Sequence, residues 1–556
     1  MEENKKSGLA AARHEIPTLF PYLKKYKNGL LVGSLCVLLT AGAAMVVPLA
    51  VSKTLNYITN EANTFKPRAG ITLVETYLLK SVGLETLTPV VWDIQGKWLD
   101  YWAMADSRGA NRLPYYFAAI LGFALVSGLF RFLQRRIIIG ISRKIEYDLR
   151  NDLFEHLLKL SPSFYNRMTT GDIVARATND MNQVRSMLGP GVMYPINAIL
   201  TMIFALGGMI YLSPILAIVA MFPPLIMAIG TNRFAKTLHE RFTLVQEQYS
   251  NISTKVQENL TGIRVVKAYT REDSEVESIR ELNKDYLEKN LKYFRSMGVL
   301  YPFFDFSHNL GIFVVLSLGS YLMIQPGTAF QVGDFAAFIL YLNMLHFPMI
   351  SIGWVLNVIQ RGVASLTRIN EIFDTEPVIA DPSQPLPTKE LKGRLTFKNV
   401  DFGYNEDGLV LKNIDLDIRP GMILGVVGAT GSGKSTLTHL IPRFYDPTHG
   451  EVLLDGEPLS KYRLKDLRKT VGLVAQDHFM FSTTVGKNIG FGMDPTDYSM
   501  EAVEQASRLA VLHENVVDFP RGYETMVGER GVTLSGGQRQ RAAIARALAI
   551  NPRILI

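Results

Sequence analysis

The first 365 residues alternate between long apolar segments and stretches rich in charged side chains. Six of the apolar segments are close to or above the roughly 20 residues that a helix needs to cross a bilayer. They lie at 29–51, 113–133, 190–212, 214–232, 299–324 and 335–359. A buried helix of a soluble protein could imitate one such segment. Six in one half of a chain instead predict a helical membrane domain.

Lysine and arginine are distributed unevenly among the connections between these segments. The short connections 211–214 and 325–334 contain none, whereas 134–188 and 233–297 are rich in them. Because cytoplasmic connections carry the excess of positive charge, both ends of the chain are expected to lie in the cytoplasm. The connection 59–112 is then external, and its three tryptophans fit either an interfacial helix or a small external subdomain.

The pattern changes after the last apolar segment. A Pro-rich polar stretch has the composition of a linker, and from about residue 393 β-branched runs separated by turns indicate an α/β domain. Before it, apolar residues every three to four positions within 134–188 predict helices that continue into the cytoplasm. The predicted division is an N-terminal segment 1–28, a transmembrane domain 29–373, a linker 374–392 and an α/β domain 393–556.

Composition narrows the function classes. The net charge of +7 comes with basic residues clustered beside apolar spans, which favours a membrane protein and argues against a nucleic-acid partner. The single cysteine, Cys36, excludes an intrachain disulfide and cannot build a metal site alone. It lies in an apolar run, where a small buried residue is expected.

A glycine-rich segment, GATGSGKS at 428–435, follows the apolar run 422–427 and precedes a helix predicted to begin near Lys434. In this strand–loop–helix context, glycines turn backbone N–H groups inward around phosphate oxygens. The Lys434 ammonium would hold the β- and γ-phosphates, and the Ser435 hydroxyl would bind Mg²⁺. The segment therefore predicts a nucleotide site preceded by a strand at 422–427.

A second motif, LSGGQ at 534–538, stands about a hundred residues later, before the basic helical stretch 539–548. Its serine and glycines expose backbone donors at a helix start, which suits a phosphate group. Alone it could be an ordinary capping turn. Its distance from the phosphate loop favours a second contact to nucleotide.

These motifs resemble those of the ATP-binding-cassette transporters, specifically exporter-type half-transporters in which the membrane domain precedes the nucleotide domain. The resemblance extends over LSGGQRQRAAIARAL and covers nearly the whole chain except 59–112. It implies a multi-domain fold, with an all-α six-helix transmembrane domain and an α/β phosphate-loop domain. It also implies ATP and Mg²⁺ as ligands.

The resemblance assigns roles to individual residues. Tyr404 in FGY is similar to the ring that stacks on adenine, and Gln476 is similar to the glutamine that reaches Mg²⁺ and the attacking water. The implied catalytic residues are Lys434 and Gln476, and the implied Mg²⁺ ligands are Ser435 and Gln476. The implied nucleotide-binding residues are Tyr404, Gly428, Ala429, Thr430, Gly431, Ser432, Gly433, Lys434, Ser435, Thr436, Gln476, Ser535, Gly536, Gly537 and Gln538.

The basic connections 134–188 and 233–297 resemble the two cytoplasmic loops of exporters through SPSFYNRMTTGDIVARATNDMNQVRSML and VQENLTGIRVVKAYTRED. Their tips, roughly 163–175 and 249–262, are implied to be coupling helices that dock on nucleotide domains. Ordinary amphipathic helix pairs are the alternative. Glu529, in TMVGERG, is implied to face these loops.

The sequence departs from the family pattern at 553–556, where it stops before two carboxylates of the hydrolytic site. The implied catalytic glutamate and the switch histidine are therefore not in the sequence. Ile554–Ile556 is expected to begin a strand inside a parallel sheet. The α/β domain is thus expected to be incomplete and the sequence to be a fragment of a longer polypeptide. Alone, its phosphate loop would bind nucleotide but hydrolyse it poorly.

Polar residues also occur inside the predicted spans. Asp305, His308 and Asn309 lie in 299–324, and Asn343 and His346 lie in 335–359. An ionisable group in a span is a functional-site hypothesis by default. Asp305 could serve substrate or proton, or could lie beyond the bilayer on the cytoplasmic side. The others are more often satisfied polar groups of a helical core.

The resulting interpretation is ATP-driven export, or flipping, of a small amphipathic substrate such as a drug or lipid by alternating access. It requires a second half-transporter, identical or related, and a lipid bilayer. A peptide exporter, an ATP-gated channel and a regulatory subunit are alternatives, because fold does not fix function. No targeting segment is apparent, and the half-size architecture favours a prokaryotic inner membrane with the nucleotide domain in the cytoplasm.

Overall fold

The computed structural model describes residues 14–62, 113–325, 330–387, 391–404, 408–528, 531 and 533–556. The chain forms two compact units. The helical unit comprises Met1–Leu149 and Asn179–Arg368, and the mixed unit comprises Arg150–Thr178 and Ile369–Ile556. The first basic connection therefore contributes its central part to the unit that contains the phosphate loop. Most of the predicted external connection and Glu529 lie outside the described residues.

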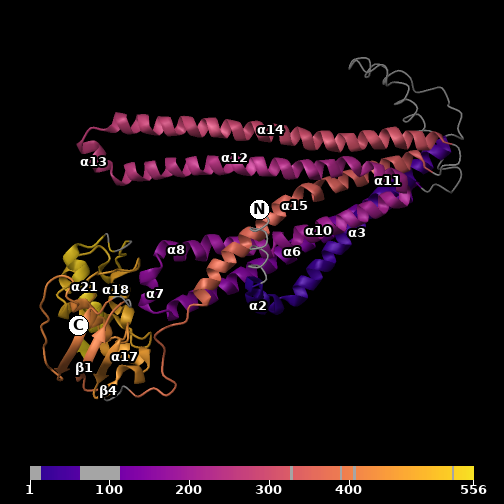
Figure 1. Ribbon diagram of the computed structural model, residues 1–556. Helices are drawn as coiled ribbons and strands as arrows, with labels where there is room; N and C mark the ends of the chain where they lie inside the picture. Colours follow the sequence, from indigo (N-terminus) through magenta and orange to yellow (C-terminus); the bar gives the residue numbers. More distant parts are fainter. Residues whose placement is uncertain are drawn as a thin grey trace. The chain divides into compact units, whose positions relative to one another are not determined.

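Long helices dominate the N-terminal two thirds of the chain (Figure 1). Five described helical segments are long and apolar enough to cross a membrane, namely Lys27–Thr59, Pro114–Lys159, Thr170–Leu212, Glu272–Ile324 and Val332–Phe373. The helices are η1 (Ile16–Leu19), α2 (Phe20–Lys25), α3 (Lys27–Ala62), α6 (Leu113–Lys159), α7 (Pro162–Arg167), α8 (Thr170–Ala175), the π-helical η3 (Arg176–Asp180), α9 (Met181–Leu188), α10 (Pro190–Leu212), α11 (Pro214–Ala220), α12 (Phe222–Thr261), α13 (Ile263–Ala268), α14 (Glu272–Ile324) and α15 (Val332–Phe373).

The predicted span 214–232 forms two helices rather than one. α11 ends at Ala220 and α12 begins at Phe222, with Met221 between them. Proline lacks the backbone N–H that a continuous helix would use, but it is tolerated in the first turn of a new helix. Pro223 stands in that first turn of α12. The expected helical character is confirmed here, whereas the expected continuity is not.

A tight core joins α3, α10 and α15. Tyr341 of α15 is fully buried, and its hydroxyl donates to the Met45 carbonyl oxygen at 2.8 Å. The ring lies directly over Gly208 of α10, where an added Cβ would come within 2.5 Å of the Tyr341 Cζ atom. In a bilayer, helices associate through close packing, so a glycine at this crossing lets the ring fill the space between them.

The second basic connection turns later in the sequence than predicted. α12 and α14 run side by side as a long pair joined by α13 (Figure 1). α12 continues to Thr261, the Gly262 N–H closes it on the Glu258 carbonyl at 2.7 Å, and α14 begins at Glu272. The predicted tip 249–262 is therefore the last part of α12, and the turn occupies 262–271. In the first connection, α7 and α8 coincide with the predicted tip 163–175.

The buried carboxylate of Asp180 joins η3 to α15 by hydrogen bonds. Asp180 accepts hydrogen bonds from the Ser365 hydroxyl at 2.9 Å and from Arg368, whose Nε lies 2.9 Å from Oδ2 and whose Nη2 bonds Oδ1. Replacing Asp180 with alanine removes these bonds. Because hydrogen bonds to charged groups contribute more than neutral ones, we expect the free energy of unfolding to fall by about 2 kcal/mol. Thermal unfolding of the detergent-solubilised protein measures it.

The matched control for this prediction is Asp172→Ala in α8. Asp172 is an exposed carboxylate in the first turn of its helix. Its replacement is expected to change the free energy of unfolding by no more than about 0.5 kcal/mol. Equal destabilisation by the two substitutions would contradict the role given to the Asp180 pair.

The mixed unit contains a four-stranded antiparallel sheet in the order β2-β1-β3-β4. The strands are β1 (Leu395–Phe402), β2 (Leu411–Ile418), β3 (His449–Leu454) and β4 (Glu457–Pro458). The buried side chains of β1 pack with residues of the helices α16 (Lys434–Leu440) and α17 (Leu464–Thr470). Separately, β5 (Val471–Gly472) pairs in parallel with β6 (Ile554–Leu555), which confirms a parallel strand beginning at Ile554.

The strand predicted at Met422–Val427 is wrong for the described structure. The segment has no regular secondary structure, and Ile423 and Val427 are 96 % and 94 % exposed. A strand forms only when a neighbouring strand pairs with its backbone N–H and C=O groups. Within the described residues no strand pairs with this segment. The apolar run 422–427 predicted a strand, but it did not determine whether another strand would pair with it.

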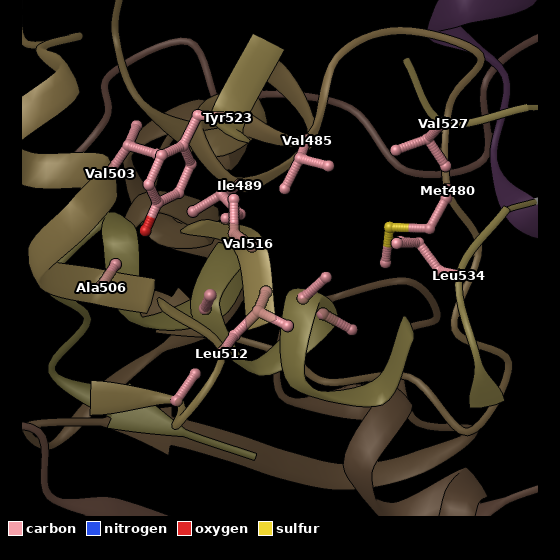
Figure 2. Packing of buried hydrophobic residues seen from close by; sticks show 14 residues of the cluster. Met480, Val485, Ile489, Val503, Ala506, Leu512, Val516, Tyr523, Val527 and Leu534 are labelled. Atoms are coloured by element: carbon pink, nitrogen blue, oxygen red, sulfur yellow. The ribbon is translucent and has the colours of Figure 1, made fainter. Parts of the chain in front are cut away.

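A second core lies in the C-terminal part of the mixed unit. Figure 2 shows Tyr523, Val503 and Ile489 facing one another, with Leu512 and Val516 beside them. It is built mainly from short helices, so the unit has one core under the sheet and another among helices. The remaining elements are η4 (Leu459–Lys461), α18 (Val485–Ile489), η5 (Gly490–Gly492), α19 (Met500–Leu509), α20 (His513–Val517), η6 (Gly522–Glu524) and α21 (Gly536–Ala549).

Candidate nucleotide-binding site

The phosphate loop forms a closed turn at the start of α16. Gly431 and Gly433 have φ values of 86° and 88°, a left-handed conformation that side chains rarely adopt. Gly433 is the N-cap of α16, which begins at Lys434 as the sequence predicts. The Lys434 ammonium donates to the carbonyl oxygens of Gly428 at 2.8 Å and Ala429 at 2.7 Å. The positive charge is therefore already held inside the loop.

The loop has little room for larger residues. A Cβ added at Gly428 would lie 2.7 Å from the Ser432 hydroxyl oxygen, and one added at Gly433 would lie 2.9 Å from Leu411 Cδ2. Ser435, in the first turn of α16, is exposed. A compact loop with an ammonium group and an adjacent hydroxyl fits a nucleotide phosphate with Mg²⁺, which prefers oxygen ligands.

The predicted adenine-stacking ring lies beside this loop. Tyr404 lies two residues after the end of β1 and is 41 % exposed. Its hydroxyl donates to the Thr436 hydroxyl at 3.1 Å. It also packs edge-on against Phe402, with ring centroids 5.0 Å apart. One hydrogen bond thus joins the end of β1 to α16, and the ring stays partly accessible.

A second tyrosine connects this group to the first basic connection. Tyr445 packs edge-on against Tyr404, with centroids 5.2 Å apart and planes at 89°. Asn166 of α7 donates from Nδ2 to the Tyr445 hydroxyl at 2.9 Å. Burial raises the pKa of the Tyr445 phenol, so it stays neutral at physiological pH. No contact between Asn166 and Tyr445 was expected from the sequence, because the two residues are 279 positions apart.

The same connection makes further contacts inside the mixed unit. The Ile379 N–H donates to the Ser161 hydroxyl at 3.2 Å, and Arg176 pairs with Glu371 at 2.6 Å. His156 Nε2 lies 3.0 Å from the Thr375 carbonyl oxygen. Residues 150–178 are therefore attached both to the segment that precedes the sheet and, through Asn166, to the region of the phosphate loop.

Gln476 lies on the segment that follows β5, and its side chain is exposed. Further along, this segment is anchored by Arg546 of α21, which donates to the Phe479 carbonyl at 3.0 Å and the Asn488 carbonyl at 2.8 Å. The Arg546 guanidinium also lies over the rings of Phe481 and Phe491. Burial lowers the pKa of Arg546, although not enough to remove its charge. The sequence predicted no role for Arg546, which in the structure joins α21 to the segment that follows Gln476.

The second motif is a helix N-terminus with a complete capping box. The Ser535 side chain accepts from the Gln538 N–H at 3.2 Å, and the Ser535 N–H donates to Gln538 Oε1 at 2.8 Å. Gly536 and Gly537 follow and are exposed. The capping box leaves the first N–H groups of α21 facing outward, a position suited to an anion.

In the structure, the predicted nucleotide-binding residues lie in two separate parts of the mixed unit. The phosphate loop, Tyr404 and Thr436 are brought together next to the sheet core. The Ser535–Gln538 motif belongs to the helical core, to which Arg546 links the segment after Gln476. Among the described residues, no group of three His, Cys, Asp or Glu could hold a metal ion. The two Mg²⁺ ligands predicted in this chain, Ser435 and Gln476, are both exposed.

This fold and site define a class of protein: a helical membrane domain combined with a phosphate-loop nucleotide domain. Residues 30–349 match the family model of the ABC transporter transmembrane region, and residues 411–556 match that of the ABC transporter. The chain belongs to the ABC transporter family. It is a membrane protein with the half-transporter arrangement, and it binds ATP and acts as an ATPase coupled to transport.

Similar proteins occur in several bacteria. The ABC transporter ATP-binding protein YknU of Bacillus subtilis is 36 % identical over 440 residues, 78 % of this chain and 74 % of that protein. The multidrug resistance-like ATP-binding protein MdlA of Escherichia coli is 35 % identical over 448 residues, 80 % of this chain and 75 % of that protein. The ATP-dependent lipid A-core flippase of Syntrophus aciditrophicus is 34 % identical over 451 residues, 81 % of this chain and 74 % of that protein.

The fold is also similar to a solved structure, that of a bacterial Atm1-family ABC exporter with ATP bound. The TM-score is 0.65 over 96 % of this chain and 85 % of that one, at 23 % sequence identity. At this level of identity the likeness concerns the fold alone. The expected fold class, a helical transmembrane domain of exporter type plus an α/β nucleotide domain, is confirmed.

Proposed function

We propose that this chain exports, or flips between leaflets, a small amphipathic molecule such as a drug or lipid, and that two such half-transporters work together by alternating access. The names of its relatives, among them a multidrug resistance-like protein and a lipid A-core flippase, support this substrate class. The nucleotide domain and both termini would lie in the cytoplasm of a bacterium, with the helices in its inner membrane. The excess of positive charge in 134–188 and 233–297 supports this orientation.

The observation that carries the proposal is a continuous set of contacts from a cytoplasmic loop to the phosphate loop. Asn166 in α7 bonds Tyr445, Tyr445 packs edge-on against Tyr404, and Tyr404 bonds Thr436 directly behind the phosphate loop. α7 directly follows the long helix α6, which runs from a predicted span into the cytoplasm. A rearrangement at the nucleotide would therefore be transmitted to a membrane helix through these contacts.

Each residue of the site would have a separate task. The Tyr404 ring would stack on the adenine. The Lys434 ammonium would leave the carbonyl oxygens of Gly428 and Ala429 and bind the β- and γ-phosphates, while the loop N–H groups surround them. Ser435 and Gln476 would hold Mg²⁺, which when bound neutralises part of the phosphate charge. The exposed Gln476 would also orient the attacking water.

The second motif supports the proposed dimer. The Ser535–Gln538 motif sits on the helical core and presents its N–H groups outward. We therefore infer that it completes the nucleotide site of a second half-transporter, identical or related, while the partner's motif completes this one. Two cassettes closed over ATP would favour one arrangement of the membrane helices, and reopening would restore the other.

Transport into inside-out membrane vesicles tests the proposal. Mg·ATP should drive a fluorescent amphipathic substrate into the vesicles against its gradient, and ADP should not. A passive conductance that ATP opens, without accumulation, would instead indicate a channel. ATP turnover with neither accumulation nor conductance would indicate a regulatory subunit. Either result would overturn the export proposal.

The contact between Asn166 and Tyr445 makes its own prediction. Tyr445→Phe keeps the ring against Tyr404 but removes the hydroxyl that Asn166 bonds. We expect ATP binding to stay within about twofold, while the stimulation of ATPase activity by substrate falls about three- to tenfold, corresponding to a coupling of roughly 1 kcal/mol. ATPase assays in nanodiscs, with and without substrate, measure both quantities.

A double-mutant cycle separates this specific contact from general damage. Asn166→Ala removes the other side of the same bond, so the double variant should lose no more stimulation than either single variant. Tyr165→Phe is a neighbouring control, because the Tyr165 hydroxyl bonds the Leu157 carbonyl oxygen of its own loop. Additive losses at Asn166 and Tyr445, or an equal loss in the control, would refute the coupling role.

A further inference from the structure

A polar cluster lies between two apolar helices of the helical unit. It consists of Asp305 and His308 on α14 and Asn343 and His346 on α15, each pair spaced by three residues on its helix. His308 Nε2 is 2.8 Å from Asn343 Oδ1, and the rings of His308 and His346 have centroids 4.8 Å apart. The cluster belongs to the helical unit, whereas the phosphate loop belongs to the mixed unit.

Side chains of α15 lie against two glycines of α14 that follow the cluster. A Cβ at Gly319 would lie 3.0 Å from the Phe335 ring, and one at Gly311 would lie 3.2 Å from Leu342 Cδ2. Small residues at such crossings let membrane helices approach closely. Gly311 and Gly319 follow His308 on α14, and their contacts with Leu342 and Phe335 fix an antiparallel alignment in which His308 meets His346.

The cluster carries an isolated charge. Among the six predicted spans, Asp305 is the single acidic residue, and Arg131 in 113–133 is the single basic one. Asp305 and Asn343 are exposed on the surface of this chain. A charged side chain that faced lipid would be strongly unfavourable, so residues of this kind generally face a bundle interior or a water-filled cavity. The surface around Asp305 and Asn343 is therefore better suited to line a polar pathway than to contact lipid acyl chains.

The cluster also has an unused hydrogen-bonding atom. His346 Nε2 is buried and has no hydrogen-bond partner among the described residues. Two large aromatic side chains flank the polar group along the sequence, Phe306 at 65 % and Phe347 at 57 % exposure. A carboxylate, imidazole nitrogens and aromatic faces are the groups that attract an organic cation, through charge, hydrogen bonding and cation–π contact.

We propose that Asp305, His308, Asn343 and His346 form the membrane-embedded binding site for the positively charged part of an amphipathic organic cation, with Phe306 and Phe347 beside its apolar part. This inference rests on the proposed export function and narrows its substrate class. The charge argument selects a cation, because the carboxylate of Asp305 is not balanced by a basic residue of α14 or α15 within their predicted spans.

The test compares two probes of the same shape and opposite charge, tetraphenylphosphonium and tetraphenylborate. Binding of each to the full chain in nanodiscs is measured by equilibrium dialysis, with empty nanodiscs subtracted and no nucleotide present. We expect tetraphenylphosphonium to bind at least about tenfold more tightly than tetraphenylborate, because like charges repel in a poorly solvated site. This comparison needs no variant, so it does not depend on whether a substitution folds.

Variants then locate the charge preference. Asp305→Asn should weaken tetraphenylphosphonium binding about tenfold, and Asp305→Glu should restore most of the affinity. The matched control is Asp273→Asn, which removes one charge from an exposed position near the start of the same helix and should change the affinity by less than about twofold. Equal binding of the two probes, or equal affinity of Asp305→Asn and the parent, would overturn the proposal.

The failure of this inference can be told from a failure of the export function. ATP binding and vesicle transport are measured on the same preparations. Transport of an amphipathic substrate without any preference for the cationic probe would contradict the proposed site at Asp305 but would not contradict the export function. A cation preference that Asp305→Asn abolishes, in a protein that does not transport, would support the site and contradict the export proposal.

Discussion

ATP turnover by the transporter is expected to fall by about 10²- to 10³-fold when Lys434 is replaced by alanine, since a preorganised charge at the transferred phosphate is worth several kcal/mol. The Lys434 ammonium is the cation that the structure holds within the loop, bonded to the carbonyls of Gly428 and Ala429. No other residue of the described loop 428–436 carries a positive charge. Phosphate release by the transporter reconstituted in nanodiscs measures the effect.

The fold should tolerate this substitution. Both carbonyl groups that Lys434 caps lie on exposed residues, so water can replace the ammonium after its removal. Lys461→Ala is a matched control, because Lys461 forms an exposed pair with Glu457 that contributes at most about 0.5 kcal/mol. We expect this control to keep full turnover and both variants to unfold at similar temperatures. Normal turnover in Lys434→Ala would remove the phosphate-loop assignment.

The second large effect is expected from Gly536→Asp, which should lower ATP turnover by about 100-fold or more. Gly536 is the first residue of α21, directly after the N-cap Ser535, and it is exposed. If this helix start contacts the phosphate held by the partner, an added carboxylate would repel it at close range. The nucleotide affinity of the separated cassettes should change little, because this chain's own phosphate loop is untouched.

Stability should respond in the opposite direction to activity. An added Cβ at Gly536 meets nothing within 4 Å, so the side chain fits without displacing neighbours. An acidic residue in the first turn of a helix favours the helix by about 0.3–1 kcal/mol. The unfolding temperature should therefore stay level or rise. Gly536→Ala is the uncharged control and should keep turnover within about tenfold. Full activity of Gly536→Asp would show that α21 does not meet a phosphate.

Local features of this protein could be predicted because neighbouring residues create them. The phosphate loop needs glycines at 431 and 433 and a lysine one position later, and its conformation follows largely from that order. The capping box of α21 is likewise closed by Ser535 and Gln538, three residues apart. The parallel strand at Ile554 was also predicted, from a short apolar run at the end of the sequence.

Three predictions about the bounds and pairing of elements were wrong. The apolar run 422–427 looked like a strand, but a strand exists only when another pairs with it. The tip of the second basic connection was placed too early, because α12 continues to Thr261 and the turn follows at Gly262. Met221 interrupts a segment whose hydropathy alone suggested one continuous helix.

The sequence by itself determined that this protein spans a membrane and binds nucleotide, because both properties arise from contiguous residues. The first follows from apolar runs long enough to cross a bilayer, and the second from a glycine-rich turn followed by a lysine. Only the tertiary structure decided which distant residues act together. Asn166 meets Tyr445 across 279 positions, and the glycines of α14 bring His308 to His346. These contacts depend on how distant elements pack together, which cannot be predicted from a local pattern of side chains.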